Sequence, residues 1–366
     1  MILNTLNRWI RPEMRIGRKM CSAFQVCGLT GQAAAFSLAQ FLTVRRGLDV
    51  WVTLSLAALA AAVFLVLAML TKIVTGKEKL VFYHHLISVL TVSAVVLYLR
   101  GLPVLPYLDI SALAIGLFLV FGRVGCLMVG CCHGRPSRFG VTYRKEHARA
   151  GFPGCYVATP LVPVQGLEAL YVAGIVAAGS ALVMAGTTPG TALAWFVTAY
   201  GVGRFGLELL RGDAERPYLA GLSEAQWSAI VTVIVTQAAR PIYPWEVCAA
   251  AVVSAIAVAR FAGRERLLHP RHVKEVAEAL RRDPGPGGAI HVRRTSLGIA
   301  LSRGIVENAS ATVSHYAFSR ANAALDTRRA SLLARVILCL QPGEGRCEFY
   351  RGEQGVFHIV TTREHS

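Results

Sequence analysis

Long apolar blocks separated by short charged turns dominate the first 260 residues of the chain. Such blocks predict membrane-spanning helices, because a bilayer core of about 30 Å needs roughly 20 apolar residues per helix. We expect six helices, and their ranges are about 21–44, 50–70, 81–99, 110–129, 164–184 and 191–210. A seventh starts near residue 223 and is interrupted at Arg240-Pro241, before an apolar run over 245–262. The segment from residue 223 and the run over 245–262 form either one broken helix or two helices. The expected fold class is therefore an all-α polytopic membrane bundle with seven or eight transmembrane helices.

The composition supports a membrane protein. Hydrophobic residues make up 54% of the chain and charged residues only 16%, against about 25% charged in soluble domains. These values exclude a disordered chain, a coiled coil and an ordinary soluble enzyme. The formal net charge of +17 indicates anionic lipid headgroups and cytoplasmic loops rather than nucleic acid, and we expect no nucleic-acid partner.

Composition divides the chain into three regions. Residues 1–20 form a basic leader, and residues 21–262 form the transmembrane domain, with a polar, Arg- and Gly-rich excursion at 132–160. Residues 263–366 have the composition of a small soluble α+β domain. We expect this tail to be cytoplasmic, because basic residues follow the last apolar run. The basic residues of the leader also predict a cytoplasmic location, whereas Arg45-Arg46 after the first helix predicts the opposite topology. The side of the membrane on which the N-terminus lies therefore stays open.

The tail shows its own local signals. Residues 270–282 have apolar positions at helical spacing, and Asp-Pro-Gly-Pro-Gly-Gly at 283–288 reads as a linker. Residues 289–292 favour a strand, and 347–350 with 356–360 favour a hairpin. We expect few contacts to cross the linker.

Charged side chains fall inside three of the expected helices. A charged side chain at membrane depth is costly and is a functional hypothesis by default. Arg123 lies deep in the helix at 110–129. In the helix at 191–210, an i, i+4, i+8 spacing puts three side chains on one face: Tyr200, Arg204 and Glu208. The helix at 164–184 adds Gln165 and Glu168.

Two readings of these charges compete. Arg204 and Glu208 could simply neutralise each other within the bundle. However, two arginines, two carboxylates and an amide on three helices are more than charge neutralisation requires. A guanidinium also offers a planar fork that suits phosphate. We therefore predict a polar cavity inside the membrane that these side chains share.

Nine cysteines are present, and three of them crowd together as Cys126, Cys131 and Cys132, followed by His133. A metal or redox site is one interpretation of this cluster. Zinc sites usually combine a C-x2–4-C pair with a second pair elsewhere, and the sequence has no such second pair and no C-x-x-C. The pattern favours packing, and we expect no metal site and no cofactor.

Four motifs in order resemble the bacterial prolipoprotein diacylglyceryl transferase family. Residues 122–134, with Gly122-Arg123, Gly125, Gly130 and Gly134, resemble the signature G-R-x-G-N-x-x-N-G-E-x-x-G. Residues 163–168 resemble the end of H-P-S-Q-L-Y-E. The series Tyr200-x3-Arg204-x3-Glu208-x2-Arg211 and the segment 221–228, Gly-Leu-Ser-x-x-Gln-Trp-Ser, are also close to the family's form. Order and spacing hold over roughly two-thirds of the chain.

The resemblance implies a seven-helix bundle in the bacterial inner membrane. Such enzymes transfer the diacylglyceryl group of phosphatidylglycerol to the lipobox cysteine of a prolipoprotein and release glycerol phosphate. The implied partners are phosphatidylglycerol, prolipoprotein signal peptides and membrane lipids, and we expect a monomer. The nucleophile is the substrate thiolate, so no nucleophile or metal of the enzyme is required.

Site residues follow from the matching motifs. By resemblance, Arg123 and Arg204 clamp the phosphate, and Glu208 orients Arg204. Tyr200 and Gln165 position lipid or peptide. The remaining substrate-binding positions are Glu168, Gly125 and Gly134.

The chain departs from the family where the base is expected. The family's H-G-G motif falls on Tyr83-His84-His85, so a tyrosine occupies the histidine position. We expect Tyr83 to donate a hydrogen bond to the phosphate or leaving oxygen and His84 to act as the base, because a histidine pKa suits proton transfer. Cys126 and Cys131 replace an asparagine and a glutamate of the signature. A catalytically altered or silent lipid-binding relative therefore stays open, as does a transporter, although transporters commonly contain repeats and we find none.

Overall fold

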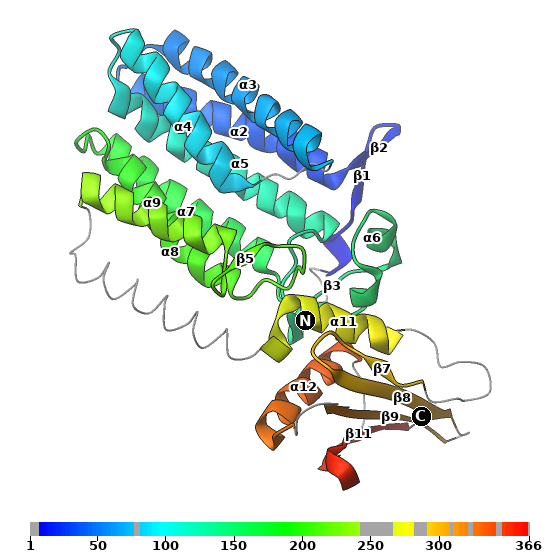
Figure 1. Ribbon diagram of the computed structural model, residues 1–366. Helices are drawn as coiled ribbons and strands as arrows, with labels where there is room; N and C mark the ends of the chain where they lie inside the picture. The colour runs from blue at the N-terminus through cyan, green and yellow to red at the C-terminus, as the bar shows by residue number, and fades with distance from the viewer. Residues whose placement is uncertain are drawn as a thin grey trace.

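The computed structural model describes residues 7–76, 81–241, 266–281, 291–307, 310–320, 325–341 and 346–364. Long helices form a bundle, and a β-rich tail lies at one end of it (Figure 1). The bundle helices are α2 (Ala23–Arg45), α3 (Val50–Thr75), α4 (Phe82–Leu99), α5 (Val104–Val129), α7 (Val164–Met184), α8 (Thr191–Glu208) and α9 (Glu224–Ala239). Each corresponds to a helix predicted from the sequence, and the prediction of a helical bundle is confirmed.

Four of the described helices are long and apolar enough to cross a membrane: α3, α4, α5 and α7. α2, α8 and α9 lie alongside them (Figure 1). The apolar run at 245–262 lies outside the described residues. The chain is thus a membrane protein with four candidate spans among the described helices, and the count of seven or eight stays a prediction.

α5 begins at Val104, about six residues before the expected start. Asp109, which directly precedes the expected start at residue 110, lies inside the helix and is buried. Its carboxylate accepts hydrogen bonds of 2.7 Å from the backbone N–H groups of Gly190 and Leu193. These groups belong to the first turn of α8, where N–H groups have no partner within the helix. Asp109 therefore caps α8 from within the neighbouring helix instead of marking the start of α5.

The excursion after α5 forms a compact unit. It contains β3 (Pro136–Thr142), α6 (Lys145–Arg149), the 3-10 turn η1 (Gly154–Tyr156) and β4 (Pro160–Leu161), and β3 pairs antiparallel with β4. Its aromatic side chains Tyr143, Phe152 and Tyr156 are buried. The leader contributes a hairpin of β1 (Glu13–Ile16) and β2 (Lys19–Ser22). A second short hairpin, β5 (Tyr218–Leu219) and β6 (Leu222–Ser223), precedes α9.

The tail is an antiparallel five-stranded sheet with helices packed on it. The strand order is β10-β11-β9-β8-β7. The strands are β7 (Arg293–Arg294), β8 (Ile299–Glu307), β9 (Ala311–Arg320), β10 (Arg346–Arg351) and β11 (Phe357–Glu364), and the helices are α11 (Pro270–Arg281), preceded by the turn η2 (Arg266–Leu268), and α12 (Thr327–Leu340). The predicted helix at 270–282 and the predicted hairpin are confirmed as α11 and β10–β11. The strand expected at 289–292 falls partly outside the described residues, and the structure has β7 directly after it.

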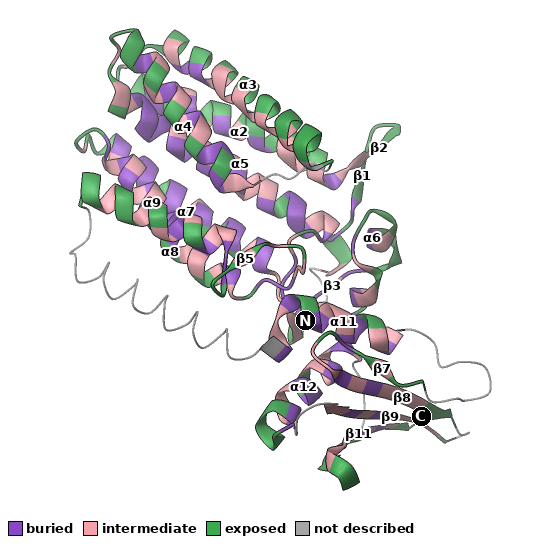
Figure 2. Ribbon diagram, viewed as in Figure 1, coloured by how far each residue is buried: buried purple, intermediate pink, exposed green. Residues whose placement is uncertain are grey.

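The expectation that few contacts cross the linker at 283–288 is wrong. One hydrophobic core contains Tyr143, Phe152 and Tyr156 of the excursion together with Val276 of α11 and Phe318 of β9. α11 lies between the bundle and the sheet (Figure 1), and buried residues continue across this junction (Figure 2). Burial of the apolar side chains of the excursion is favourable, and the tail removes them from water.

Polar contacts reinforce the same junction. The Arg281 guanidinium donates to the Val157 carbonyl oxygen and, at 2.9 Å, to the Thr159 hydroxyl. Arg271 donates to the carbonyl oxygens of Ala214 and Arg216, each at 3.2 Å. The tail is therefore anchored to both loops at the polar end of the bundle.

Candidate active site

A buried carboxylate joins the arginines of two helices. Glu168 of α7 places Oε2 3.0 Å from Nε of Arg123 on α5 and 3.6 Å from Nη1 of Arg204 on α8. Glu168 and Arg204 are 1% and 4% exposed. A buried charge is destabilising unless it is paired, and this pairing links α5, α7 and α8 at one depth.

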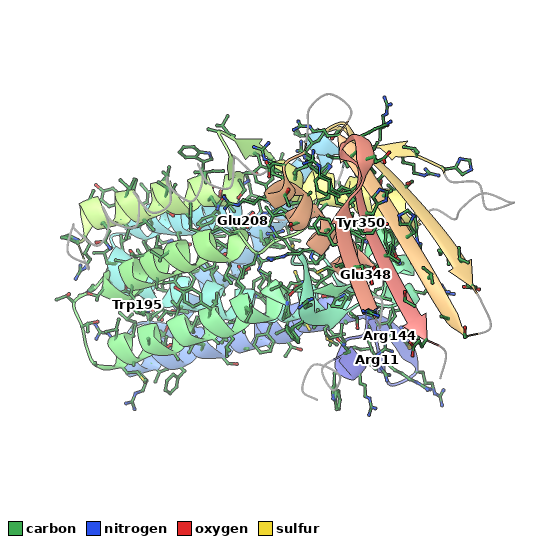
Figure 3. All side chains as sticks on the ribbon, turned by 90° about the horizontal axis from the view of Figure 1, so that it is seen from below. Arg11, Arg144, Trp195, Glu208, Glu348 and Tyr350 are labelled. Atoms are coloured by element: carbon green, nitrogen blue, oxygen red, sulfur yellow. The ribbon has the colours of Figure 1, made fainter. Side chains whose placement is uncertain are left out.

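A second carboxylate extends the network toward the tail. Arg204 Nη2 lies 2.6 Å from Glu208 Oε2, and Arg211 Nη1 lies 3.6 Å from the same oxygen. Arg216 contacts Glu208 Oε1, and Arg211 holds Asp213 through two hydrogen bonds of 2.8 and 2.7 Å. Glu208 lies at the end of the bundle that faces the tail (Figure 3). The four arginines of the network exceed its three carboxylates by one positive charge.

Two tyrosines pack beside this network. The Tyr200 hydroxyl donates to Glu168 Oε1 at 3.1 Å. The ring of Tyr83 lies 5.7 Å from that of Tyr200, and both tyrosines are buried. The structure thus brings Tyr83, Tyr200, Glu168, Arg204 and Glu208 together, but as partners of one another rather than on an open surface.

Three other predicted substrate-binding residues, Gln165, Gly125 and Gly134, contact neighbouring parts of the protein. Gln165 Nε2 donates to the carbonyl oxygen of Cys131 at 2.8 Å and lies 3.4 Å from the Tyr143 hydroxyl. A Cβ atom at Gly125 would lie 3.1 Å from the Phe24 ring, and one at Gly134 would lie 2.2 Å from the Val162 carbonyl oxygen. Gln165 therefore holds the excursion, and the two glycines allow close packing.

A cavity of about 910 Å³ lies between α2, α3, α4 and α5. Most of its wall is apolar, with Phe36, Phe64 and Phe118 among the lining residues, and Arg123 forms part of the wall. The cavity continues to Glu215 and to Lys274 of α11. Arg204, Glu208 and Gln165 are not among its lining residues. Of the four side chains expected to share one cavity, only Arg123 therefore lines it.

Arg123 is the network member that reaches this cavity. Its Nε is held by Glu168, as described above. Within the described part of the chain, no hydrogen bond engages its two terminal nitrogens. The terminal nitrogens of Arg204, in contrast, both face carboxylates. Arg123 is therefore free to bind an anionic group, whereas Arg204 is already paired.

The two adjacent histidines of α4 have different environments. His84 places Nε2 2.9 Å from Glu224 Oε1 of α9, its side chain is 54% exposed, and it does not line the cavity. His85 is buried and lines the cavity, with Nδ1 2.9 Å from the Val81 carbonyl oxygen. Its Nε2 has no hydrogen-bond partner among the described groups. The geometry favours His85, and not the expected His84, as the histidine of the site.

Three thiols meet on the cavity wall beyond Arg123. The sulfur atoms of Cys126, Cys131 and Cys132 all lie within 4.8 Å of one another, and all three residues line the cavity. Hydrogen bonds from Cys126 and Cys131 hold the pKa of Cys132 well below its usual value, and Arg211 and Arg123 act in the same direction. Burial lowers the pKa of the adjacent His133. The sequence favours packing for these cysteines, but their sulfurs form a cluster.

Comparisons with known proteins agree with the motifs. Residues 50–240 match the sequence model of the family described as prolipoprotein diacylglyceryl transferase. The chain is 29% identical over 134 residues to a phosphatidylglycerol–prolipoprotein diacylglyceryl transferase of Clostridium tetani, which covers 36% of this chain and 51% of the relative. It is 31% identical over 137 residues to phosphatidylglycerol–prolipoprotein diacylglyceryl transferase 2 of Clostridium perfringens, covering 36% and 49%. The chain spans about half the length of the curated relatives it matches.

Proposed function

Because the chain belongs to the prolipoprotein diacylglyceryl transferase family, we propose that it transfers the diacylglyceryl group of phosphatidylglycerol to the cysteine thiol of a prolipoprotein. The thiolate sulfur forms a bond to the glyceryl carbon while the bond from that carbon to the phosphate oxygen breaks. Glycerol phosphate leaves with the electron pair of the broken bond. The enzyme must hold an anionic phosphate next to apolar chains and keep water away from the reaction.

The observation that carries the proposal is the position of Arg123. Its terminal nitrogens have no hydrogen-bond partner among the described residues, and it forms part of the wall of an otherwise largely apolar cavity. The apolar wall suits the acyl chains, and the guanidinium fork suits the phosphate. Preorganised positive charge stabilises the charge that develops on the leaving phosphate. The one unpaired positive charge of the arginine network matches the single negative charge of a phosphodiester.

The base in this proposal is His85. A thiol with an ordinary pKa of about 8.5 is mostly protonated at neutral pH, so a proton acceptor accelerates its attack. His85 lines the cavity and keeps Nε2 without a partner among the described groups. Tyr83, at the family's histidine position, packs on Tyr200 beside the network and does not line the cavity.

A lipid-binding relative without transfer activity is the second candidate. The observation that favours it is a set of substitutions: Cys126 and Cys131 on the cavity wall replace residues of the family signature, and Tyr83 replaces the family's histidine. Such a protein would bind phosphatidylglycerol through Arg123 and leave the thiol unmodified.

The membrane arrangement is also a proposal. We infer that α2, α8 and α9 complete the membrane bundle with α3, α4, α5 and α7, so that the chain crosses the membrane seven or eight times. The protein then acts as a monomer in the bacterial inner membrane, with the C-terminal tail in the cytoplasm.

One assay tests the transfer. Purified full-length protein in phosphatidylglycerol vesicles is incubated with a lipobox peptide, and mass spectrometry scores the diacylglyceryl adduct. We expect an adduct with phosphatidylglycerol, none with a peptide whose cysteine is replaced by serine, and none with Arg123→Ala. Arg100→Ala, an exposed arginine at the end of α4, is the matched control and keeps activity. Binding of the lipid without any adduct would favour the second candidate.

A further inference from the structure

The proposed transfer gives no role to the three thiols of the cavity wall. Cys126 is buried, Cys132 is half-buried and Cys131 is exposed. Their sulfurs lie within 4.8 Å of one another. They share the cavity with Arg123 and His85, so a group held by the thiols would lie on the wall of the space that takes the substrates.

The chain is folded back so that the thiols meet. α5 ends at Val129, and its C-cap residue Gly130 has a φ of 85°, in the left-handed region. Cys132 also has a positive φ, of 55°, a conformation that is strained for a residue with a side chain and that persists only where the surroundings enforce it. Here Gln165 holds the Cys131 carbonyl oxygen at 2.8 Å, and Phe152 leaves no room for a Cβ at Gly130. The backbone therefore presents Cys131 and Cys132 to Cys126.

Three sulfurs around one point match the ligand set of a soft metal ion. Thiolates select zinc and copper(I) over hard cations. A Zn–S distance of about 2.3 Å in tetrahedral geometry corresponds to sulfur separations of about 3.8 Å, and the three sulfurs lie within 4.8 Å of one another. A disulfide would use two of the three sulfurs and leave the third without a partner.

The electrostatic surroundings suit the same ion. Three thiolates and Zn²⁺ carry a net charge of −1. Arg123 and Arg211 both interact electrostatically with Cys132, so positive charge faces the cluster. A zinc site with three protein ligands keeps a fourth position for another ligand, and here all three ligands line the cavity from which such a ligand would come.

We propose that Cys126, Cys131 and Cys132 bind a zinc ion whose fourth position takes the sulfur of the substrate cysteine. The inference rests on the proposed function for the identity of that thiol. A thiol that coordinates zinc is deprotonated, and the released proton passes to His85 on the wall of the same cavity. The thiolate then attacks the glyceryl carbon, the bond to the phosphate oxygen breaks, and the thioether product leaves the metal.

Metal binding is tested first, without any measurement of transfer. Full-length protein is purified in detergent under reducing conditions, incubated with zinc, desalted and analysed for metal content. We expect one zinc ion per chain. Cys126→Ser, Cys131→Ser and Cys132→Ser are each expected to weaken zinc binding at least tenfold. Cys155 and Cys339 are half-buried cysteines outside the cluster. The control variants Cys155→Ser and Cys339→Ser should therefore keep wild-type zinc binding. Thermal unfolding of every variant verifies that it is folded.

Cobalt then reports on the fourth position. Co²⁺ bound in place of zinc gives thiolate-to-metal charge-transfer absorption. We expect this absorption to change when the lipobox peptide is added and to stay constant with the serine peptide. An unchanged spectrum with the cysteine peptide would overturn the substrate-binding role.

The remaining outcomes are distinct. Absence of zinc from the wild type, equal binding by the serine variants, or a disulfide within the cluster of the unreduced protein would overturn the zinc site. Transfer at an unchanged rate by zinc-free wild type would also overturn the role of zinc, while leaving the transfer proposal intact. Zinc binding and a cobalt response without any adduct would contradict the proposed function alone.

Discussion

Glu168 controls the positions of the charged side chains around it. Its carboxylate contacts Arg123 and Arg204 and accepts the hydrogen bond from Tyr200. A side chain that is 1% exposed cannot exchange these partners for water. The orientation of Arg123 toward the cavity therefore depends on a residue that does not itself line the cavity.

We predict that Glu168→Gln lowers the transfer rate on the order of 10²–10³-fold, comparable to the loss of one preorganised donor. The change keeps the shape of the side chain but removes the negative charge that holds Nε of Arg123. It also leaves buried arginines uncompensated, so the free energy of unfolding should fall by about 3–5 kcal/mol. Tyr200→Phe removes only one hydrogen bond, worth about 1 kcal/mol, and is the milder control. Transfer kinetics and thermal unfolding measure both effects, and a wild-type rate for Glu168→Gln would contradict this role.

Arg123 and Arg204 should respond differently to substitution. Arg123→Ala should abolish the adduct and lower stability less than Arg204→Lys does, because it loses only the Nε contact with Glu168 and its terminal nitrogens have no hydrogen bonds to described groups. Arg204→Lys should lower stability and weaken transfer, because both of its terminal nitrogens face carboxylates and lysine lacks the planar fork. Measuring thermal unfolding together with the transfer rate distinguishes an effect on stability from an effect on transfer for each variant. Equal effects of both changes on stability would show that Arg123 is a structural ion-pair partner.

The sequence predicts the members of this site better than their contacts. Arg123, Arg204 and Glu208 stand out because charge within apolar helices is costly. Which carboxylate meets which arginine depends on the registers of three helices, and no single-helix pattern specifies these. His84 and His85 differ by about 100° around α4, and only the packing of α4 decides which one faces the cavity.

At the scale of elements, α5 is the helix against which others pack. A Cβ atom at Gly116 would lie 2.4 Å from the Phe196 ring of α8 and 2.8 Å from Val176 of α7. Phe196 is fully buried. Gly116 thus permits the close approach of three helices that aligns Arg123 with its partners.

Gly116→Ala should therefore destabilise the bundle by about 1–3 kcal/mol through overpacking. The matched control is Gly174→Ala on α7, where the added Cβ meets no atom within 4 Å. This control should be neutral or stabilising, because alanine favours the helix by up to about 1 kcal/mol over glycine. Unfolding in detergent measures both variants, and similar stabilities for the two would refute the packing argument.

The sequence predicts helices well where an apolar block is bounded by charges or turns. It places the start of α5 too late because Asp109 resembles a helix entrance, and its role in capping α8 is a tertiary contact. α12 was not among the expected elements, although Asp326 accepts a hydrogen bond from the Arg329 N–H at its start. Leu333, Ile337 and Leu340 follow at helical spacing. The β8–β9 pair depends on long-range strand pairing, which local patterns indicate weakly.

At the scale of the whole molecule, the tail and the excursion stabilise each other. Removing residues 291–364 should leave the helices inserted but expose Val276 and Leu280 of α11 together with Tyr156 of the excursion. We predict faster tryptic cleavage at the basic residues of α6 and a lower unfolding temperature, because this apolar surface is returned to water. Cleavage at the leader residues Arg15 and Arg18 should not change. Unchanged cleavage at α6 would show that the excursion folds without the tail.

His272 makes the tail itself sensitive to acid. Burial lowers its pKa, although a hydrogen bond to Leu267 and the charge of Glu275 oppose this. Nδ1 lies 2.7 Å from the Leu267 carbonyl oxygen and Nε2 lies 3.0 Å from the Thr295 hydroxyl, which suits a neutral ring. The unfolded chain takes up a proton near pH 6.5 and the folded chain only at lower pH, so stability falls as the pH drops below about 6.5.

The loss at His272 is at most about 1.4 kcal/mol per pH unit. His272→Gln keeps a neutral polar side chain and should flatten this part of the profile. Unfolding of both proteins between pH 5 and pH 8 measures the difference, and parallel profiles would remove His272 from the acid response.

The shared core also sets an order of events during synthesis. More than a hundred residues separate Tyr156 from α11 along the chain. At about 5–20 residues per second, the ribosome needs on the order of ten seconds to make that segment. During this interval the excursion has emerged, but the helix and sheet that cover Tyr143, Phe152 and Tyr156 do not yet exist. The nascent chain therefore passes through a stage in which an aromatic surface is exposed beside the membrane, and a slower ribosome lengthens the time in which other proteins can bind it.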